Sequence, residues 1–333
     1  MRYATMKNKK IFDEIYRTIT ENNSFFITSH INPDGDAIGS ELAFFLFLKK
    51  LKKKAIIVNH DPLPKIYNFL PGSRHCMHIN DIEEDMPVNM KIALLLDSSN
   101  LNRTGEIQKV LIHAKKIINI DHHCSNNRYG GINYVDITAS STGEIIFDFI
   151  NYIRPEMIDE EIATCLYTAI ITDTGAFRYE NTSKKTYEVA AKLVSIGIKP
   201  HIISQNIYNR KSFKELKLLG AALSTLETDK DNFASWVTID REMLKRTNST
   251  DENTEGIIET VSTLKNSEVF LLFRETDNNT TKVSIRSKGH FNVNKFALKF
   301  NGGGHPNAAG CMCRGNIKDV KEKLLDALLK EKI

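Results

Sequence analysis

The first half of the chain alternates short apolar segments with segments of helical length, and polar residues follow the apolar ones. Segments 24–30, 91–97 and 116–121 have the length and composition of buried strands. Segments 37–52 and 106–115 read as helices between them. Such alternation predicts βαβ units and a parallel sheet. Because ligands bind at the carboxyl ends of parallel strands, we expect the functional residues of this doubly wound α/β domain to lie there.

The 333 residues are enough for two domains. A further strand is expected over 54–59, and further helices over 141–153, 160–172, 183–196 and 201–210. The second half has strand-like segments at 233–239, 268–274 and 281–287 and helix-like segments at 254–264, 293–300 and 318–330. We therefore expect a catalytic domain over 1–190, a helical linker over 191–214 and a smaller α+β domain over 215–333, with the active site in the cleft between the domains.

Carboxylates and imidazoles gather where predicted elements end. They are His30, Asp34, Asp36, Asp97, Asp121, His122, His123 and Asp173. Each residue alone has a simpler interpretation, since a single Asp often caps a helix or forms a turn. Together they place several anionic groups in a small space, which requires cations to neutralise them. The sequence therefore predicts a two-metal hydrolase site.

The donor types also indicate which cations fit. Carboxylates with imidazoles suit manganese, zinc, iron or cobalt better than calcium, which prefers oxygen ligands alone. We expect two Mn²⁺ ions, with Co²⁺ or Mg²⁺ as substitutes. Two such ions can activate water and assist an in-line displacement at phosphorus. Adjacent His122 and His123 point in opposite directions, so one can ligate a metal while the other faces the substrate.

A glycine run in the second half carries a further candidate site. Gly302, Gly303 and Gly304 precede His305, and Arg286 ends a predicted strand. A glycine run is often a flexible turn, but it also lets the backbone approach a ligand and offer N–H groups to anions. Since arginine suits bidentate phosphate recognition, we interpret these residues as a phosphate or nucleotide cradle.

The charge and the cysteine content bear on nucleic-acid binding, on zinc binding and on the location of the protein. The net charge is only +4, which argues against binding of bulk nucleic acid. The basic cluster at 49–54 ends a predicted helix, where cations complement the helix dipole. The five cysteines form no Cys-x-x-Cys pair; Cys311 and Cys313 would share one strand face, but a zinc site usually needs four ligands. With no signal-like or membrane-spanning segment, we expect a cytoplasmic protein without membrane association. The oligomeric state is not decided by the sequence, and a homodimer is one option.

The combination of motifs resembles the DHH phosphoesterase family with a C-terminal DHHA1 domain. The matching stretches are 29–36, 96–97, 121–123, 172–175 and 302–305, in this order over nearly the whole chain. In size the chain looks like the short branch of nanoRNases and pAp phosphatases, which also contains phosphodiesterases that act on cyclic di-AMP or pApA. The glycine-triplet motif argues against the family's pyrophosphatases, and the length leaves no room for the extra regions of RecJ-type exonucleases.

The resemblance implies a role for each site residue. One manganese ion would be held by His30, Asp34 and Asp97, and the other by Asp36, Asp97, His122 and Asp173, with Asp97 bridging. His123 would stay off the metals and face the scissile phosphate, and Arg103 would contact the substrate. The stretch with Ser140 and Ser141 would line the pocket, and Arg286 with Gly302, Gly303, Gly304 and His305 would bind the nucleotide.

The expected activity is hydrolysis of short oligoribonucleotides of two to five nucleotides, of 3′-phosphoadenosine 5′-phosphate (pAp), or of both. Short RNA or DNA oligonucleotides and small nucleotides are thus the expected binding partners. The alternative is a phosphodiesterase for cyclic di-AMP or pApA. A nucleotide-binding sensor without turnover is disfavoured because every ligand of the motif is present.

Overall fold

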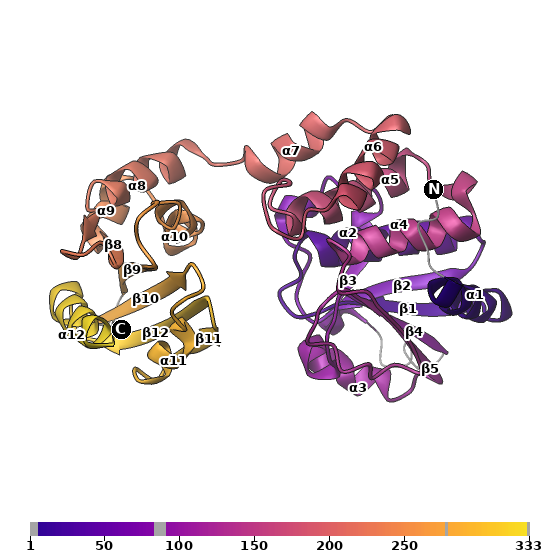
Figure 1. Ribbon diagram of the computed structural model, residues 1–333, viewed down its shortest axis with the longest axis horizontal. Coiled ribbons are helices and arrows are strands. Elements are labelled where there is room, and N and C mark those ends of the chain that lie inside the picture. Colours follow the sequence, from indigo (N-terminus) through magenta and orange to yellow (C-terminus); the bar gives the residue numbers. More distant parts are fainter. Residues whose placement is uncertain (1–5, 83–90, 277–278, 332–333) are drawn as a thin grey trace. The chain divides into compact units, whose positions relative to one another are not determined.

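The computed structural model describes residues 6–82, 91–276 and 279–331. The chain forms two compact units, Met1–Arg210 and Lys211–Ile333 (Figure 1). The first unit is built on a parallel sheet and the second on a separate sheet, as expected for a mixed α/β protein. The division falls within segment 191–214, most of which belongs to the first unit. No helix in the described ranges combines the length and apolar character needed to cross a bilayer.

The sheet of the first unit has six parallel strands in the order β3-β2-β1-β4-β5-β6. They are β1 (Ser24–Thr28), β2 (Lys54–Asn59), β3 (Cys76–His78), β4 (Ile92–Leu96), β5 (Lys116–Asp121) and β6 (Ile132–Val135). The chain runs outward from β1 to β3 in one direction and from β4 to β6 in the other. The order therefore reverses between β1 and β4, and this switch point is where open α/β sheets bind ligands.

Helices cover both faces of this sheet, as the doubly wound prediction requires. The α-helices are α1 (Met6–Glu21), α2 (Gly35–Lys50), α3 (Gln108–Leu111), α4 (Thr142–Ile153), α5 (Glu160–Asp173), α6 (Lys184–Ser195) and α7 (Pro200–Tyr208). Short 3-10 helices are η1 (Lys65–Tyr67), η2 (Ser73–His75), η3 (Ile79–Asp81), η5 (Leu101–Ile107) and η6 (Pro155–Met157). In Figure 1, α2 and α4 lie on one side of the sheet and α3 on the other.

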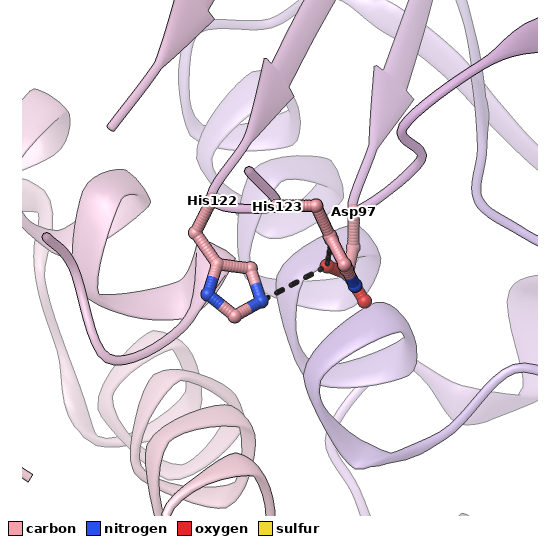
Figure 2. Close-up of side chains that lie close together, drawn as sticks. All are labelled: Asp97, His122 and His123. Carbon is pink, nitrogen blue, oxygen red and sulfur yellow. Dashed lines mark ion pairs between the residues drawn. The ribbon is translucent and has the colours of Figure 1, made fainter. Parts of the chain in front are cut away.

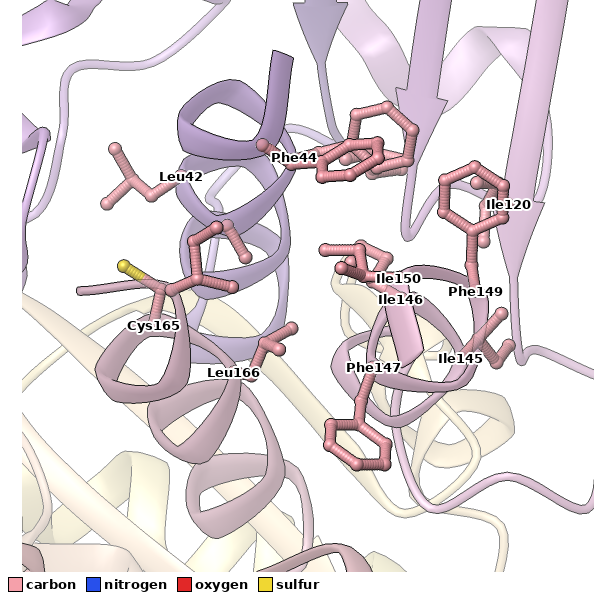
Figure 3. Close-up of a cluster of buried hydrophobic side chains, with 14 of the residues drawn as sticks. Leu42, Phe44, Ile120, Ile145, Ile146, Phe147, Phe149, Ile150, Cys165 and Leu166 are labelled. Carbon is pink, nitrogen blue, oxygen red and sulfur yellow. The ribbon is translucent and has the colours of Figure 1, made fainter. Parts of the chain in front are cut away.

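The two faces bury cores of unequal size. The larger core joins the sheet to α1, α2, α4 and α5. Figure 3 shows Phe44 of α2, Phe149 of α4 and Leu166 of α5 in this core, and the Phe44 and Phe149 rings stack with their centroids 5.7 Å apart. The smaller core lies under η5 and α3 and contains Phe26, Val58, Ala93, Leu95, Ile107 and Leu111. Neighbouring strand residues thus enter opposite cores, which explains why these strands are continuously apolar.

The helix expected over 106–115 is much shorter than predicted. Residues 101–107 form the 3-10 helix η5, and α3 covers only Gln108–Leu111. Gly105 has a left-handed φ of 58°, and a Cβ there would lie 2.6 Å from the His60 ring. An α-helix cannot continue through that conformation, so the chain turns at Gly105, just before the expected helix. At the other end the N–H groups of His113 and Ala114 donate to the oxygens of Val110 and Leu111, as in a 3-10 turn, and the α-helix ends at Leu111. Helix α1 and strand β6 were not anticipated.

The second unit has a mixed six-stranded sheet in the order β11-β12-β10-β9-β8-β7. Its strands are β7 (Glu227–Thr228), β8 (Ala234–Ile239), β9 (Val269–Thr276), β10 (Thr280–Ser287), β11 (Gly303–His305) and β12 (Ala308–Arg314). Its helices are α8 (Phe213–Leu223), α9 (Arg241–Arg246), η7 (Asp251–Thr254), α10 (Ile257–Val261), α11 (Val293–Leu298) and α12 (Ile317–Lys330). One core joins the sheet to α11 and α12 and another joins it to α8, α9 and α10, so this unit is α+β. As expected, Cys311 and Cys313 share a strand face, with their Sγ atoms 3.9 Å apart.

Candidate metal centre

The predicted ligands meet at the switch point of the first sheet. His30 lies just beyond β1, Asp97 directly follows β4, and His122 directly follows β5. Asp97 has a left-handed φ of 54°, and its N–H donates to the oxygen of Ile120 at 3.0 Å. Such a backbone conformation is uncommon for a non-glycine residue and often marks functional sites. It aims the Asp97 side chain away from the strand and toward the histidines.

One group of possible ligands consists of His30, Asp34 and Asp97. His30 Nε2 lies 3.4 Å from Asp97 Oδ2 and 3.9 Å from Asp34 Oδ2. His30 Nδ1 lies 2.7 Å from the oxygen of Ile31, so a hydrogen on Nδ1 leaves the Nε2 lone pair for a metal. Asp34 also caps α2, because its Oδ1 accepts from the N–H groups of Asp36 and Ala37. The capping and ligand interpretations of Asp34 are therefore compatible, each using a different oxygen.

A second group consists of Asp36, His122 and Asp173. His122 Nε2 lies 3.7 Å from Asp36 Oδ2 and 3.6 Å from Asp173 Oδ2. The same nitrogen lies 3.6 Å from Asp97 Oδ1, and Figure 2 shows Asp97 beside the two adjacent histidines. Asp97 thus directs Oδ2 toward the first group and Oδ1 toward the second, which is the placement that a bridging carboxylate needs.

Helix α4 holds two of these carboxylates in position. Asp36 is almost completely buried and accepts from the N–H groups of Thr142 at 2.7 Å and Gly143 at 2.9 Å. These amides open α4, where the helix dipole favours a negative charge. The Thr142 hydroxyl also donates to Asp97 Oδ1 at 3.1 Å. The start of α4 therefore fixes one carboxylate of the second group and the carboxylate shared by both.

His123 is oriented by Asp121. His123 Nδ1 lies 2.7 Å from Asp121 Oδ1, which also accepts from the N–H of His122 at 2.9 Å. Asp121 Oδ2 accepts from the Asn126 amide at 2.6 Å, and the Asp121 side chain is fully buried. A further possible ligand group joins His123 with Asp97 and His122, since His123 Nδ1 is 3.4 Å from Asp97 Oδ1. The Asp121 hydrogen bond occupies Nδ1 and leaves Nε2 for other partners.

The crowding of acidic groups alters their protonation equilibria. Burial and the neighbouring Asp97 and Asp173 raise the pKa of Asp36 well above its ordinary value. Burial raises the pKa of Asp173 to about 6. Burial also acts to raise the pKa of Asp97, but the hydrogen bond from His30 and the adjacent imidazoles outweigh it and lower that pKa. The hydrogen bond to Asp121 raises the pKa of His123 to about 9.

The other predicted residues of the first unit lie near the centre, and the hydroxyl groups of both serines already have hydrogen-bond partners. Arg103 is half-buried and its charge acts on His123, while its backbone oxygen accepts from the Ile31 N–H at 2.7 Å. Ser140 and Ser141 are fully buried. The Ser140 hydroxyl donates to Glu144 at 2.6 Å, and Ser141 caps α4. The structure thus gives both serines a role in holding α4, and their contact with substrate stays a prediction.

Two of the predicted residues of the second unit, Arg286 and His305, lie in one row across its sheet. Arg286 on β10 and His305 on β11 both pair with Ala308, from opposite sides of β12. Arg286 lines a cavity of ≈ 650 Å³ together with Arg274 and Lys282, and its guanidinium lies 2.9 Å from Glu259 Oε1. His305 is exposed. Arg286 and His305 therefore offer hydrogen-bond donors on a part of the sheet that is accessible to a ligand.

The three glycines of the run have different environments. A Cβ on Gly302 would lie 2.2 Å from the Gly310 oxygen, and one on Gly304 would lie 2.4 Å from the Ala308 oxygen. Gly304 also has a φ of 151°. A Cβ on Gly303 would meet nothing within 4 Å. Gly302 and Gly304 are therefore required by close packing against β12, and Gly303 is the glycine with space for a ligand.

Of four supporting residues, three were not assigned a role from the sequence, and Thr142 was expected only to line the pocket together with Ser140 and Ser141. Asp121 and Asn126 orient His123, Thr142 binds Asp97, and the Asn181 amide lies 3.3 Å from Asp173 Oδ2. Asp121 belongs to the motif at 121–123, and its position at the end of a buried strand could have indicated its role beside His123. Asn181 lies eight residues from its partner on an irregular segment, where local patterns carry no information on contacts.

Comparison with known proteins supports the same family as the motifs. The model of the N-terminal domain of the DHH family matches residues 24–170, and the DHHA1 domain model matches residues 237–331. The chain is 33% identical over 307 residues to the bifunctional oligoribonuclease and PAP phosphatase NrnA of Thermus thermophilus, with 92% of this chain and 89% of that protein covered. It is 27% identical over 302 residues to the protein of the same name from Bacillus subtilis, with coverages of 89% and 91%.

Solved structures show the same architecture. An exopolyphosphatase-related protein from Bacteroides fragilis matches with a TM-score of 0.86 and 30% identity, over 97% of this chain and 98% of that chain. RecJ from Thermus thermophilus, solved in complex with Mn²⁺, matches with a TM-score of 0.53 and 10% identity, over 96% of this chain and 54% of that one. At that identity the likeness to RecJ concerns the fold alone.

Proposed function

The chain belongs to the DHH family, and from this premise we propose that it is a manganese-dependent phosphoesterase that hydrolyses short oligoribonucleotides and pAp. Relatives that span most of the chain are named as oligoribonucleases and PAP phosphatases, which supports this substrate class. A cytoplasmic location is part of the proposal and agrees with the five free cysteines.

The observation that carries the proposal is the division of Asp97 between two ligand groups. One oxygen faces His30 at 3.4 Å and the other faces His122 at 3.6 Å. Each group adds carboxylates, so the two cation positions would share one bridging ligand. That arrangement is typical of centres in which two cations assist a displacement at phosphorus.

The donor set fits manganese. Both groups offer only carboxylate oxygens and imidazole nitrogens, a mixture that suits first-row transition metals better than calcium. His30, Asp34 and Asp97 would hold one ion, and Asp36, Asp97, His122 and Asp173 the other. Such ions supply Lewis-acid activation of water and charge neutralisation for the phosphate. Hydrogen bonds from the start of α4 keep Asp36 and Asp97 oriented for this task.

His123 is the candidate proton donor for the leaving oxygen. Its Nδ1 is engaged with Asp121, which fixes the ring and leaves Nε2 available to the substrate. A positioned histidine of this kind contributes about 10²–10⁴-fold to proton-transfer reactions. Arg103, whose charge acts on His123, would bind a non-bridging phosphate oxygen.

In the second unit, Arg286 and His305 would bind the part of the substrate that does not react. The row that they form with Ala308 supports a common role. Gly303, which has open space above its Cα, would offer its backbone to an anionic group. Contacts to the non-reacting part of a substrate improve positioning at the reacting centre.

A side-by-side turnover panel tests the proposal. The purified protein would be incubated with Mn²⁺ and, separately, with pAp, a diribonucleotide, pApA and cyclic di-AMP, and each reaction repeated in EDTA. We expect metal-dependent hydrolysis of the diribonucleotide and of pAp. Turnover of cyclic di-AMP or pApA alone would favour the alternative phosphodiesterase, and turnover of none of them would refute the proposal.

A further inference from the structure

A pocket of ≈ 260 Å³ adjoins the candidate metal centre, and most of its lining residues have no role in that centre. Asp34 and Asp173 contribute to the lining, and they belong to different groups of possible metal ligands. The remaining lining residues carry no charge at neutral pH; they are Gly35, Tyr67, Thr172, Ile207 and Tyr208. A partly aromatic pocket, whose only charged lining residues in the described part of the chain are Asp34 and Asp173, therefore opens beside both cation positions.

The aromatic walls of this pocket are fixed in place. Tyr208 ends α7, and its hydroxyl donates to the oxygen of Ile171 on α5 at 3.0 Å. Tyr67 ends η1, the 3-10 helix whose Lys65 and Ile66 oxygens accept from Arg210 Nη1 at 3.4 and 3.3 Å. The segment that carries Tyr208 is thus tied both to α5 and to the helix that carries Tyr67, so the pocket is formed before any ligand binds.

The lining suits a flat aromatic group and not an anion. Tyr208 is 39% exposed although its hydroxyl is hydrogen-bonded, so part of its ring surface is open. Among the residues that the structure describes, no lysine or arginine lines the pocket, and phosphate sites are built from such cations or from clustered N–H groups. Bases of single-stranded nucleic acids stack on tyrosine rings without sequence preference.

The size of the pocket limits the ligand to one nucleoside. Drug-sized ligands occupy pockets of about 300–1,000 Å³, and this one is slightly smaller. Gly35 lines the pocket, and a Cβ there would lie 2.4 Å from Thr172 Oγ1. A larger residue would therefore disturb the contact between α2 and α5.

We propose that this pocket binds the base of one nucleoside of a dinucleotide substrate, through stacking on Tyr208. The inference rests on the proposed function, because a phosphodiester at the cation positions would direct one of its two nucleosides toward Asp34 and Asp173. It adds a determinant of substrate length within the first unit, because the second nucleoside of a dinucleotide would occupy the pocket.

The test compares bases and abasic sugars in three variants. The substrates are a diribonucleotide and two analogues, each with an abasic ribose in place of one nucleoside. Tyr208→Leu removes the ring, Tyr208→Phe removes only the hydroxyl, and Tyr152→Leu is the control, since Tyr152 is 37% exposed on α4 and does not line the pocket.

We expect wild-type kcat/KM to favour the full dinucleotide over one abasic analogue by about 5- to 100-fold, the range found for stacked bases. Tyr208→Leu should lose this preference, whereas Tyr208→Phe and the Tyr152→Leu control should keep it. Photo-crosslinking provides a readout apart from turnover. A dinucleotide with 5-iodouracil should label Tyr208 or Tyr67 in the wild type.

Two results would overturn the inference. One is an equal loss of turnover by Tyr208→Leu on the full and abasic substrates, which would mean that the ring supports the metal centre and not a base. The other is crosslinking confined to residues outside the pocket. If the wild type hydrolyses neither dinucleotide nor pAp, the proposed function fails, and the crosslink still decides whether the pocket binds a base. Bound manganese and thermal melting of each variant verify that the centre and the fold are intact.

Discussion

Replacing Asp173 by asparagine should make the metal-free protein more stable while weakening metal binding. In the metal-free state Asp173 lies near the ionised Asp97, because His122 Nε2 is 3.6 Å from an oxygen of each, and the Asp97 charge acts to raise the pKa of Asp173. Coulomb's law with an effective dielectric constant of about 20 gives about 2–3 kcal/mol for two unit charges about 5–7 Å apart. The Asp173 carboxylate accepts a hydrogen bond from the Asn181 amide at 3.3 Å, and an amide oxygen can accept it equally well. The substitution therefore removes the repulsion between carboxylates and keeps the hydrogen bond from Asn181.

The expected gain is smaller than the Coulomb figure, because His122 lies between Asp97 and Asp173 and Asp173 is 27% exposed. We expect about 1–2 kcal/mol, which corresponds to a rise in Tm of about 2–8 °C for a unit of this size. Thermal melting in EDTA measures it. With saturating Mn²⁺ the order should reverse, since the wild type gains binding energy that Asp173→Asn lacks.

The pH dependence of this difference provides its control. The pKa of Asp173 is raised from 3.8 to about 6 in the folded state, so ionising this group destabilises the fold. The stability gap between the variant and the wild type should be absent below pH 3.8, grow as the pH rises to about 6, and stay constant above that. A metal-free variant that melts at or below the wild-type temperature at pH 7 would refute the idea of crowded, unneutralised carboxylates.

Four further substitutions and a length series test other parts of the molecule. Asp121→Asn should lower kcat by about 10²–10⁴-fold with both metals still bound, because His123 loses its orienting carboxylate; metal content and turnover measured together verify this. Gly302→Ala should destabilise the second unit by about 1–3 kcal/mol, since its Cβ would meet the Gly310 oxygen, whereas Gly303→Ala should change stability by less than about 0.5 kcal/mol, as denaturant titration would show. Arg286→Ala should weaken hydrolysis of nucleotides more than that of a generic phosphodiester; equal losses would place Arg286 among the catalytic residues. Rates should fall beyond about five nucleotides, with mononucleotides released stepwise from one end, because poor positioning of the reacting group lowers rates steeply; equal rates on dimers and 20-mers would contradict this limit.

The architecture of the first unit was predictable because its strands are buried on both faces. Strand β2 lies over the expected residues, and β5 ends at Asp121 as predicted. The positions of His30, Asp97 and His122 follow from that periodicity, since parallel strands bring their carboxyl ends to one edge. The prediction depended on local apolar runs and not on long-range contacts.

Other features depend on tertiary contacts that no local pattern encodes. The turn at Gly105 packs against His60, which lies 45 residues earlier in the chain. The anchoring of Asp36 by α4 joins residues 106 and 107 positions apart. The sequence also indicated three equivalent glycines, whereas their different surroundings are set by the pairing of β11 with β12.

The proposed chemistry requires that Asp97 bridge two cations held by the ends of β1, β4 and β5. Anomalous diffraction from crystals grown with Mn²⁺ would locate these cations and their ligands. We predict two manganese peaks, one coordinated by His30 and Asp34 and the other by Asp36, His122 and Asp173, with Asp97 bonded to both. A single peak, or a pair of peaks that share a ligand other than Asp97, would contradict the bridging role.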